Sequence, residues 1–204
     1  MTALFSYAIL YIVKERKEKY VSALKMSGRV YNAMMKFANG IKTAPQLANM
    51  FFANGKVYTT DSFAICCWTP AEKCEILDST TGEKIESFFF TPRMDKVSAG
   101  STIYIDSTAV DIDTKSLIPC NLDKVMNGSY HHPMDIVTGI NPDYLAAIAA
   151  LGKAVRTDRR GFAVSVDLDW AQHVLHAHID AGKNGYFDVI VMPQIDKNKL
   201  KKEQ

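Results

Sequence analysis

The sequence predicts an α+β fold in which antiparallel sheets carry helices on one face. Strand-like and helix-like segments follow each other in one recurring order, a strand, a helix and then strands ending at turn residues, about three times along 204 residues. They do not alternate one for one with long crossovers, as a doubly wound parallel sheet would require. With 48% apolar and 23% charged residues, the composition is that of a globular protein.

The first unit of this order follows a charged stretch near the N-terminus. Val30, Met34 and Phe37 recur at helical spacing, and Asn39-Gly40 is a stop signal for that helix. Asn54-Gly55 is a strong hairpin signal. The expected elements are a strand over 20–26, a helix over 29–38, and strands over 47–53 and 56–68.

The second and third units repeat the order. In the third, Asn141 is a suitable helix N-cap, followed by Pro142 at the first helical position and Asp143 in the first turn. The second unit is expected to hold a strand over 85–91, a short helix from Pro92, and strands over 101–105 and 109–112. The third is expected to hold a strand over 134–140, a helix over 141–155, strands over 162–168, 173–179 and 186–193, and a turn over 180–185.

These units predict two domains with short terminal segments. An apolar run over 2–13 is too short to span a bilayer, and its positive charges follow it, unlike those of a secretory signal. It is expected to pack on the body or to contact another subunit, with a membrane-surface anchor as the minor alternative. The expected division is an N-terminal extension over 1–19, domains over 20–125 and 126–197, and a charged tail over 198–204.

Charge and cysteine content narrow the class of function. With 24 basic and 22 acidic side chains the formal charge is +2, so any binding to nucleic acid must come from cations gathered on one face. The cysteines lack the spacing of a disulfide framework or a zinc site and are expected to be buried free thiols in a reducing cytoplasm. They are Cys66, Cys67, Cys74 and Cys120.

Four segments, in order, resemble the bacterial DNA sliding clamps, the β subunits of the replicative polymerase. Two of them are the hairpin NGKVYTTDSFAI over 54–65, similar to the family's "DGKL" turn and "ATDSYRLA", and the closing strand YFDVIVMP over 186–193. The others are LIP over 117–119, which is similar to the stretch linking clamp domains, and NPDYL over 141–145, which is similar to the start of a clamp helix. The chain departs from the family at Ala64, where clamps carry Arg, and at Gln194.

The resemblance implies a shortened clamp of phage or prophage type, built from repeated strand–helix–strands modules. A clamp has three similar domains, and this chain has room for at most two. The implied function is that of a processivity factor in DNA replication: a homo-oligomeric ring around duplex DNA that binds a peptide of a polymerase or repair protein. No catalytic residue and no cofactor is implied. The alternative is a clamp-fold interaction module, a decoy or inhibitor of a host clamp, that does not encircle DNA.

A clamp needs cations that meet phosphates without reading bases. One expected group lies on or beside the first helix, and a second runs from the end of the third unit's helix into the next loop. A solvated helix end is the competing interpretation of the second group. The expected DNA-binding residues are Lys25, Arg29, Lys36, Lys153, Arg156, Arg159 and Arg160.

The resemblance also places a partner-peptide pocket at the closing strand. Its expected residues are Leu145, Val191, Met192 and Pro193. Met suits such a surface because its side chain is flexible and polarisable. The competing interpretation is that the strand residues are ordinary core.

An enzymatic alternative rests on His176, His178 and Asp180. On a strand these three share one face, and they resemble the start of the H-x-H-x-D-H motif of metallo-β-lactamase-type hydrolases, although Ala181 replaces the final His. No nucleophile elbow, P-loop or dinucleotide-binding motif occurs in the sequence. The sequence therefore favours a protein without an active site and without a metal, with a small metallohydrolase as the third hypothesis.

Overall fold

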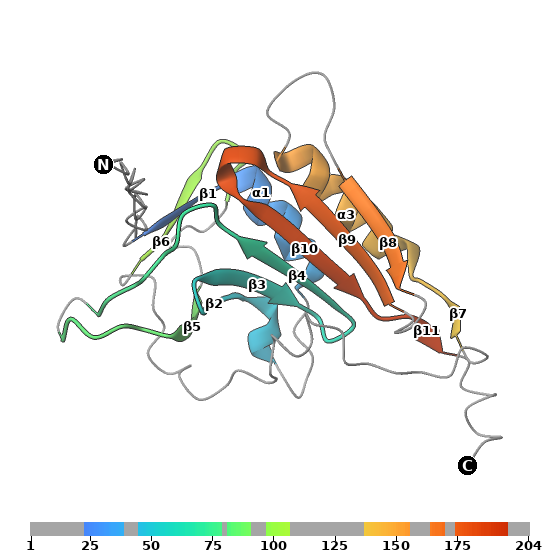
Figure 1. Ribbon diagram of the computed structural model, residues 1–204, viewed down its shortest axis with the longest axis horizontal. Helices are drawn as coiled ribbons and strands as arrows, with labels where there is room; N and C mark the ends of the chain where they lie inside the picture. Colours follow the sequence, from blue (N-terminus) through green and yellow to red (C-terminus); the bar gives the residue numbers. More distant parts are fainter. Residues whose placement is uncertain are drawn as a thin grey trace, which may run out of the picture.

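The computed structural model is a mixed α+β fold with antiparallel sheets (Figure 1). The segments expected over 1–19, 109–112, 117–119 and 198–204, and the helix expected from Pro92, lie outside the residues that the structure describes. The described residues are 23–38, 45–78, 81–90, 97–106, 137–155, 164–169 and 174–195.

A seven-stranded antiparallel sheet forms the body of the protein. Strands from both expected domains join in it, because β4 pairs directly with β10 over its whole length. The expected domain limits stay a prediction. In order across the sheet, the strands are β5 (Ser87–Phe90), β2 (Met50–Ala53), β3 (Lys56–Thr60), β4 (Ala64–Thr69), β10 (Tyr186–Val191), β9 (Val174–Asp180) and β8 (Val164–Asp169).

Two short ribbons and the helices complete the described elements. The ribbons pair β1 (Leu24–Ser27) with β6 (Thr102–Ile105), and β7 (Val137–Gly139) with β11 (Gln194–Ile195). The helices are α1 (Gly28–Met34), α3 (Pro142–Val155) and the short 3-10 helices η1 (Met35–Phe37), η2 (Pro45–Ala48) and η6 (Gly182–Asn184).

The described elements run twice through the order strand, helix, three strands. β1 and α1 precede β2, β3 and β4, while β7 and α3 precede β8, β9 and β10. In the sheet the two sets of three strands are arranged as mirror-ordered halves, β2-β3-β4 beside β10-β9-β8. Of the second expected unit, the described residues supply β5, at the edge of the large sheet, and β6, in a ribbon with β1.

The hairpin expected at Asn54-Gly55 is confirmed. Both residues have positive φ, 51° and 77°, as a type I′ turn requires. The expected single strand over 56–68 was wrong, because the chain reverses between β3 and β4. Asp61 causes the reversal: its Oδ1 accepts the backbone N–H of Phe63 at 2.9 Å and of Ala64 at 2.8 Å, a local bond that competes with strand pairing.

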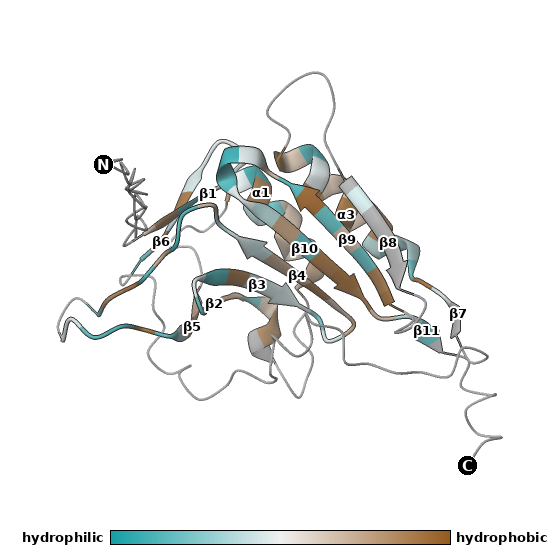
Figure 2. Ribbon diagram, viewed as in Figure 1, coloured by the Kyte–Doolittle hydropathy of each residue, from teal (hydrophilic) through white to brown (hydrophobic). Residues whose placement is uncertain are grey.

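The main core lies between the sheet and the two helices. α1 and α3 pack on each other and lie behind β9 and β10 in Figure 1. Alternate strand residues face them, as the alternating hydrophobic and hydrophilic residues along β9 and β10 show in Figure 2. Thr59 is buried in this core and donates its hydroxyl to the Met34 carbonyl at 3.0 Å, which satisfies one of the free carbonyls at the end of α1.

Candidate functional site

The exposed side of α1 and η1 carries two of the expected DNA-binding cations. Ser27 caps α1, because its Oγ accepts the Val30 N–H at 3.3 Å. Arg29 and Lys36 are both exposed and stand seven residues apart, two helical turns, which places them on one side of the helix. Within the described part of the chain, neither forms an ion pair. Both cations are therefore available to an anionic partner.

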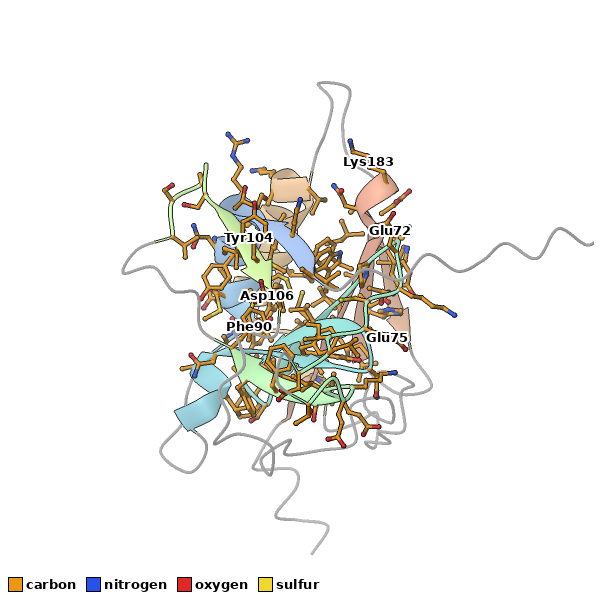
Figure 3. All side chains as sticks on the ribbon, turned by 90° about the vertical axis from the view of Figure 1, so that its left-hand side faces the viewer. Glu72, Glu75, Phe90, Tyr104, Asp106 and Lys183 are labelled. Carbon is orange, nitrogen blue, oxygen red and sulfur yellow. The ribbon has the colours of Figure 1, made fainter. Side chains whose placement is uncertain are left out.

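Lys25 lies beside these cations on the β1–β6 ribbon rather than on a helix. It is paired in register with Tyr104, and its Nζ lies 5.7 Å from the centre of that ring, a cation–π contact. Tyr104 is exposed and projects from β6, on the opposite side of the view in Figure 3 from Glu72 and Glu75. These two acidic side chains lie away from the ribbon, whereas the acidic Asp106, directly after β6, lies near Tyr104 in the same view.

Gly28 fixes the start of α1 against the loop before β6. A Cβ at this position would stand 1.9 Å from the Ser98 carbonyl oxygen, and the Gly28 N–H donates to the Ser101 carbonyl at 2.7 Å. Only glycine allows so close an approach of two backbone segments. Gly28 therefore holds the N-terminal end of α1, the helix that carries Arg29, close to this loop.

The exposed side of α3 differs from that of α1. Asp143 in its first turn is exposed and acidic, the exposed residues Leu145, Ala146 and Ala149 are neutral, and Lys153 in the last turn is its one cation. Arg156, Arg159 and Arg160, expected to extend this group, lie outside the described residues. The positive charge of the described helix layer therefore lies along α1 and at the C-terminal end of α3.

The β3–β4 turn, the start of α3 and the end of β10 meet at Asp61. Its Oδ2 accepts the hydroxyl of Tyr144 at 2.5 Å, which ties α3 to the turn. Burial, and then the hydrogen bond with Asp61, raise the pKa of Tyr144 well above its ordinary value. The Met192 N–H donates to the Phe63 carbonyl at 2.8 Å, which ties the end of β10 to the same turn.

Around these bonds lie three accessible apolar residues, here called the turn patch: Phe63, Met192 and Pro193. Leu145, which was also expected in the pocket, follows Tyr144 on α3 and is exposed. Phe63 is 64% exposed and Leu145 47% exposed, while Met192 and Pro193 are half-buried. Sequence reasoning missed Phe63, although a phenylalanine directly after the polar residues Asp61 and Ser62 was a signal for an exposed aromatic.

The fourth residue expected in the partner pocket, Val191, is not part of this surface. It has no exposed area, and its side chain packs in the core between sheet and helices. The alternation of β10 explains this difference, because Val191 shares the inner face with Val189 and Phe187. A partner could therefore reach Met192 and Pro193 but not Val191.

On the outer face of the sheet, His176 and His178 share one side of β9, as alternation predicted. Asp180 does not join them: its Oδ1 accepts the Gly182 N–H at 2.7 Å and closes the turn after β9. The carboxylate between the histidines belongs to Asp188 of β10, whose Oδ1 lies 2.8 Å from His178 Nδ1 and 3.3 Å from His176 Nε2. Sequence reasoning missed Asp188 because its partners lie on another strand.

These contacts set the pKa of the Asp188 carboxyl group. Burial acts to raise the pKa of Asp188, but the hydrogen bonds and charges of His176 and His178 outweigh it, so the pKa lies below its ordinary value. Within the described part of the chain, no group of three or more His, Cys, Asp or Glu side chains is placed so that it could hold a metal ion.

The described cysteines are buried free thiols, as expected. Burial raises the pKa of Cys66, and raises those of Cys67 and Cys74 to about 11. A thiol is nucleophilic only as thiolate, so these groups are poor nucleophiles at neutral pH. Cys120 lies outside the described residues.

Among the described helices, none has the length and apolar character to cross a membrane. No family model matches the chain, and no curated protein is significantly similar to it.

Proposed function

We propose that the chain is a clamp-like processivity factor that surrounds duplex DNA as a homo-oligomer in the cytoplasm and binds a peptide of a polymerase or repair protein. The observation that carries the proposal is the repeated order of the fold. Strand, helix and three strands occur twice, the two sets of strands join at β4 and β10, and both helices cover one face. The resemblance to sliding clamps implies repeated modules, and this repeated order supports the proposal.

The resembling segments support the proposal because three of them come together in space. The segment over 54–65 forms the β3–β4 hairpin, and the segment over 186–193 holds β10, which pairs with β4. The segment over 141–145 begins α3, whose Tyr144 reaches Asp61 of the hairpin. The proximity of these three segments supports the proposal.

The cations of the helix layer would meet the phosphates. Arg29 and Lys36 lie on one side of α1 and η1, Lys153 lies at the end of α3, and all are exposed. Long side chains of this kind contact the phosphate backbone without reading base edges, so binding is independent of sequence and weakens with salt. Few, separated contacts allow a ring to slide.

The turn patch would receive the partner peptide. Phe63, Met192 and Pro193 offer apolar surface around a backbone held by Asp61 and by the Met192–Phe63 hydrogen bond. A rigid apolar surface loses little entropy when an apolar side chain docks on it. In the proposed ring this surface remains accessible, since the helices and not the turn face the DNA.

Ring closure would require several copies. One chain supplies two helices and one sheet, whose outermost described strands are β5 and β8. Strand edges present unpaired backbone groups, and pairing between subunits both satisfies these groups and closes a ring.

The second candidate is a clamp-fold interaction module, a decoy or inhibitor of a host clamp, that does not encircle DNA. The neutral side of α3, with Leu145, Ala146 and Ala149 exposed, favours it, because a helix lining a DNA channel would gain from cations there. This candidate keeps the fold and the turn patch but lacks the electrostatic interface.

Retention on DNA separates the two candidates. The full chain is loaded on nicked circular DNA, and its retention is compared before and after linearisation, at low and at moderate salt. A ring is retained on the circle and slides off the linear form. A decoy is retained on neither, and instead binds a purified clamp of the host.

A charge-neutral double variant, Arg29→Gln with Lys36→Gln, tests the helix layer. Two lost phosphate contacts reduce the slope of log affinity against log salt by about 2. The matched control is Lys183→Gln, an exposed lysine on η6 at the β9–β10 turn. An unchanged slope in the double variant, or an equal change in the control, contradicts the proposed interface.

A further inference from the structure

A cavity of about 260 Å³ lies between β1, the beginning of α1, the end of α3 and the β9–β10 turn. Trp68 near the end of β4 and Phe187 near the start of β10 both line it. Phe63 and Met192 of the turn patch lie at the opposite ends of the same two strands, because one precedes β4 and the other follows β10. The cavity is therefore separate from the proposed peptide surface.

The floor of the cavity is apolar. Trp68 and Phe187 are paired in register, and their rings stack with centroids 6.0 Å apart. Met26 and Ala181, which also line the cavity, are buried. The indole Nε1–H of Trp68 already donates to the Asn184 carbonyl at 2.9 Å, so it does not need a partner from a ligand. An apolar group that covers this floor gains free energy by leaving water.

One wall of the cavity is held in place by Gly185. This residue has a φ of 94°, and a Cβ on it would stand 2.0 Å from the Thr69 carbonyl oxygen, so the β9–β10 turn lies directly against the end of β4. The Ala181 N–H donates to the Gly185 carbonyl at 2.9 Å and closes the same turn. A wall that is already formed costs a ligand little ordering entropy.

The mouth of the cavity carries hydrogen-bond donors. Lys25 and Ser27 are exposed and stand two residues apart on β1, so they share one side of the strand, and the exposed Asn184 comes from η6. The Lys25 Nζ lies 5.7 Å from the centre of the Tyr104 ring, a contact that is weak at an exposed site. No acidic side chain is among the described residues that line the cavity. This charge suits an anion.

A larger cavity beside the β2–β3 hairpin, of about 410 Å³, lacks this selectivity of charge. It is lined by Lys56 and Lys84 but also by Glu72 and Glu75. The Lys84 Nζ lies 3.1 Å from Glu75 Oε1, so a cation and an anion of this lining already pair with each other. The smaller cavity is therefore the better candidate for an anionic ligand.

We propose that the cavity beside Trp68 and Phe187 binds a small carboxylate with an apolar body, the size of one aromatic ring with a short chain. An engineered apolar cavity of about 150 Å³ holds benzene, so about 260 Å³ has room for a ring and a short chain. The apolar body would cover the two stacked rings, and the carboxylate would meet Lys25 and the Ser27 hydroxyl. Lys25 is also an expected DNA-binding cation, so the site is tested with no DNA present.

Calorimetric titration of the full chain at neutral pH compares phenylpropionate with its neutral analogue phenylpropionamide. One phenylpropionate is expected to bind per chain, with a Kd of about 1 mM or lower. The amide should bind at least about threefold more weakly, because it loses the charge-assisted contact with Lys25. Equal affinity for the two compounds, or no binding of phenylpropionate at concentrations well above the expected Kd, would overturn the proposal.

Two variants and two matched controls locate the ligand. Lys25→Met should lower the affinity for phenylpropionate to that for the amide, whereas Lys36→Met, which removes an exposed lysine outside the cavity lining, should not. Ala154→Leu should weaken binding of both compounds by about tenfold or more, because it fills the cavity. Ala149→Leu, on the exposed side of α3, should leave both affinities unchanged. Unaltered binding in Lys25→Met and Ala154→Leu would overturn the proposal.

Methyl NMR of the methionines gives a second measurement that does not depend on a substitution. Phenylpropionate should shift the methyl signal of Met26, which lines the cavity, and leave that of Met192 in the turn patch in place. A shift of Met192 without a shift of Met26 would place the ligand on the turn patch and contradict the proposed site. Circular dichroism of each variant checks that it remains folded.

Discussion

The two faces of the seven-stranded sheet differ in what their side chains do. On the inner face every described strand from β5 to β9 contributes to one apolar core beneath α1 and α3. The outer face carries a second, smaller apolar cluster that includes Phe51 and Phe89 and extends to Val174 of β9 and Ile190 of β10. On the same two strands it also carries the polar residues His176, His178 and Asp188.

The difference shows that one alternating pattern serves two purposes. Along β9, Leu175, Ala177 and Ile179 hold the strand in the core, while His176 and His178 between them face outward and contact Asp188 of β10. Polar groups on the outer face contribute less to stability than the core does, so substitutions there should lower the free energy of unfolding less than substitutions on the inner face. The following predictions test that contrast.

The largest effect is expected on the inner face. Phe52 is 2% exposed, and its ring stacks on that of Phe88 at 5.2 Å. Phe52→Ala should lower the free energy of unfolding by about 3–5 kcal/mol, because it removes buried area and leaves a cavity. Chemical denaturation measures it. His176→Gln on the outer face should change it by less than about 0.5 kcal/mol, and equal losses would erase the contrast.

The link between helix and turn comes next. Tyr144→Phe removes the hydrogen bond to Asp61, and its loss should cost about 1.5 kcal/mol of unfolding free energy, since the acceptor is a carboxylate. Tyr31→Phe is the matched control, because the Tyr31 hydroxyl has no described hydrogen bond. Removing that hydroxyl should change the free energy of unfolding by less than about 0.5 kcal/mol. A Tyr144→Phe variant as stable as the control would show that this bond does not hold α3.

A smaller, pH-dependent effect is expected at Asp188. Its pKa is lowered in the folded state, so the carboxylate stabilises the fold above the ordinary Asp pKa of about 3.9 and loses this contribution as the pH falls through the folded value. The difference in unfolding free energy between the unmodified chain and Asp188→Asn should be on the order of 1 kcal/mol at neutral pH. Urea denaturation across the acid range should show it shrinking below about pH 4.

The smallest effect on folding is expected on the exposed side of α1. Replacing both Arg29 and Lys36 by Gln should change the free energy of unfolding by no more than about 0.5 kcal/mol, because neither cation has a described ion-pair partner. Thermal denaturation measures this. A large destabilisation would mean that these cations serve the fold and not a partner.

Local signals in the sequence predicted the local structure. Asn54-Gly55 predicted the hairpin, and Asn141 predicted the cap of α3, where its Oδ1 accepts the Asp143 N–H at 3.0 Å. The alternation along β9 correctly placed His176 and His178 on one face. In each case the cause lies within a few residues of its effect, where propensity and periodicity apply.

Contacts between distant segments could not be predicted. The pairing of β4 with β10 places Asp188 beside the histidines and buries Val191, and no local pattern encodes that neighbour. Asp61 was missed as a turn former because β-branched and aromatic residues on both sides favour a continuous strand. The sharpest errors therefore lie where side chains from different strands meet.

Light scattering on the purified full chain tests the central claim most directly, since a clamp must close through its own copies. Ring closure predicts a single assembly whose molar mass is two or more whole multiples of the 22.7 kDa of one chain and stays constant on dilution to micromolar concentration. A mass of one chain at high concentration would contradict ring closure and leave the interaction module as the better account.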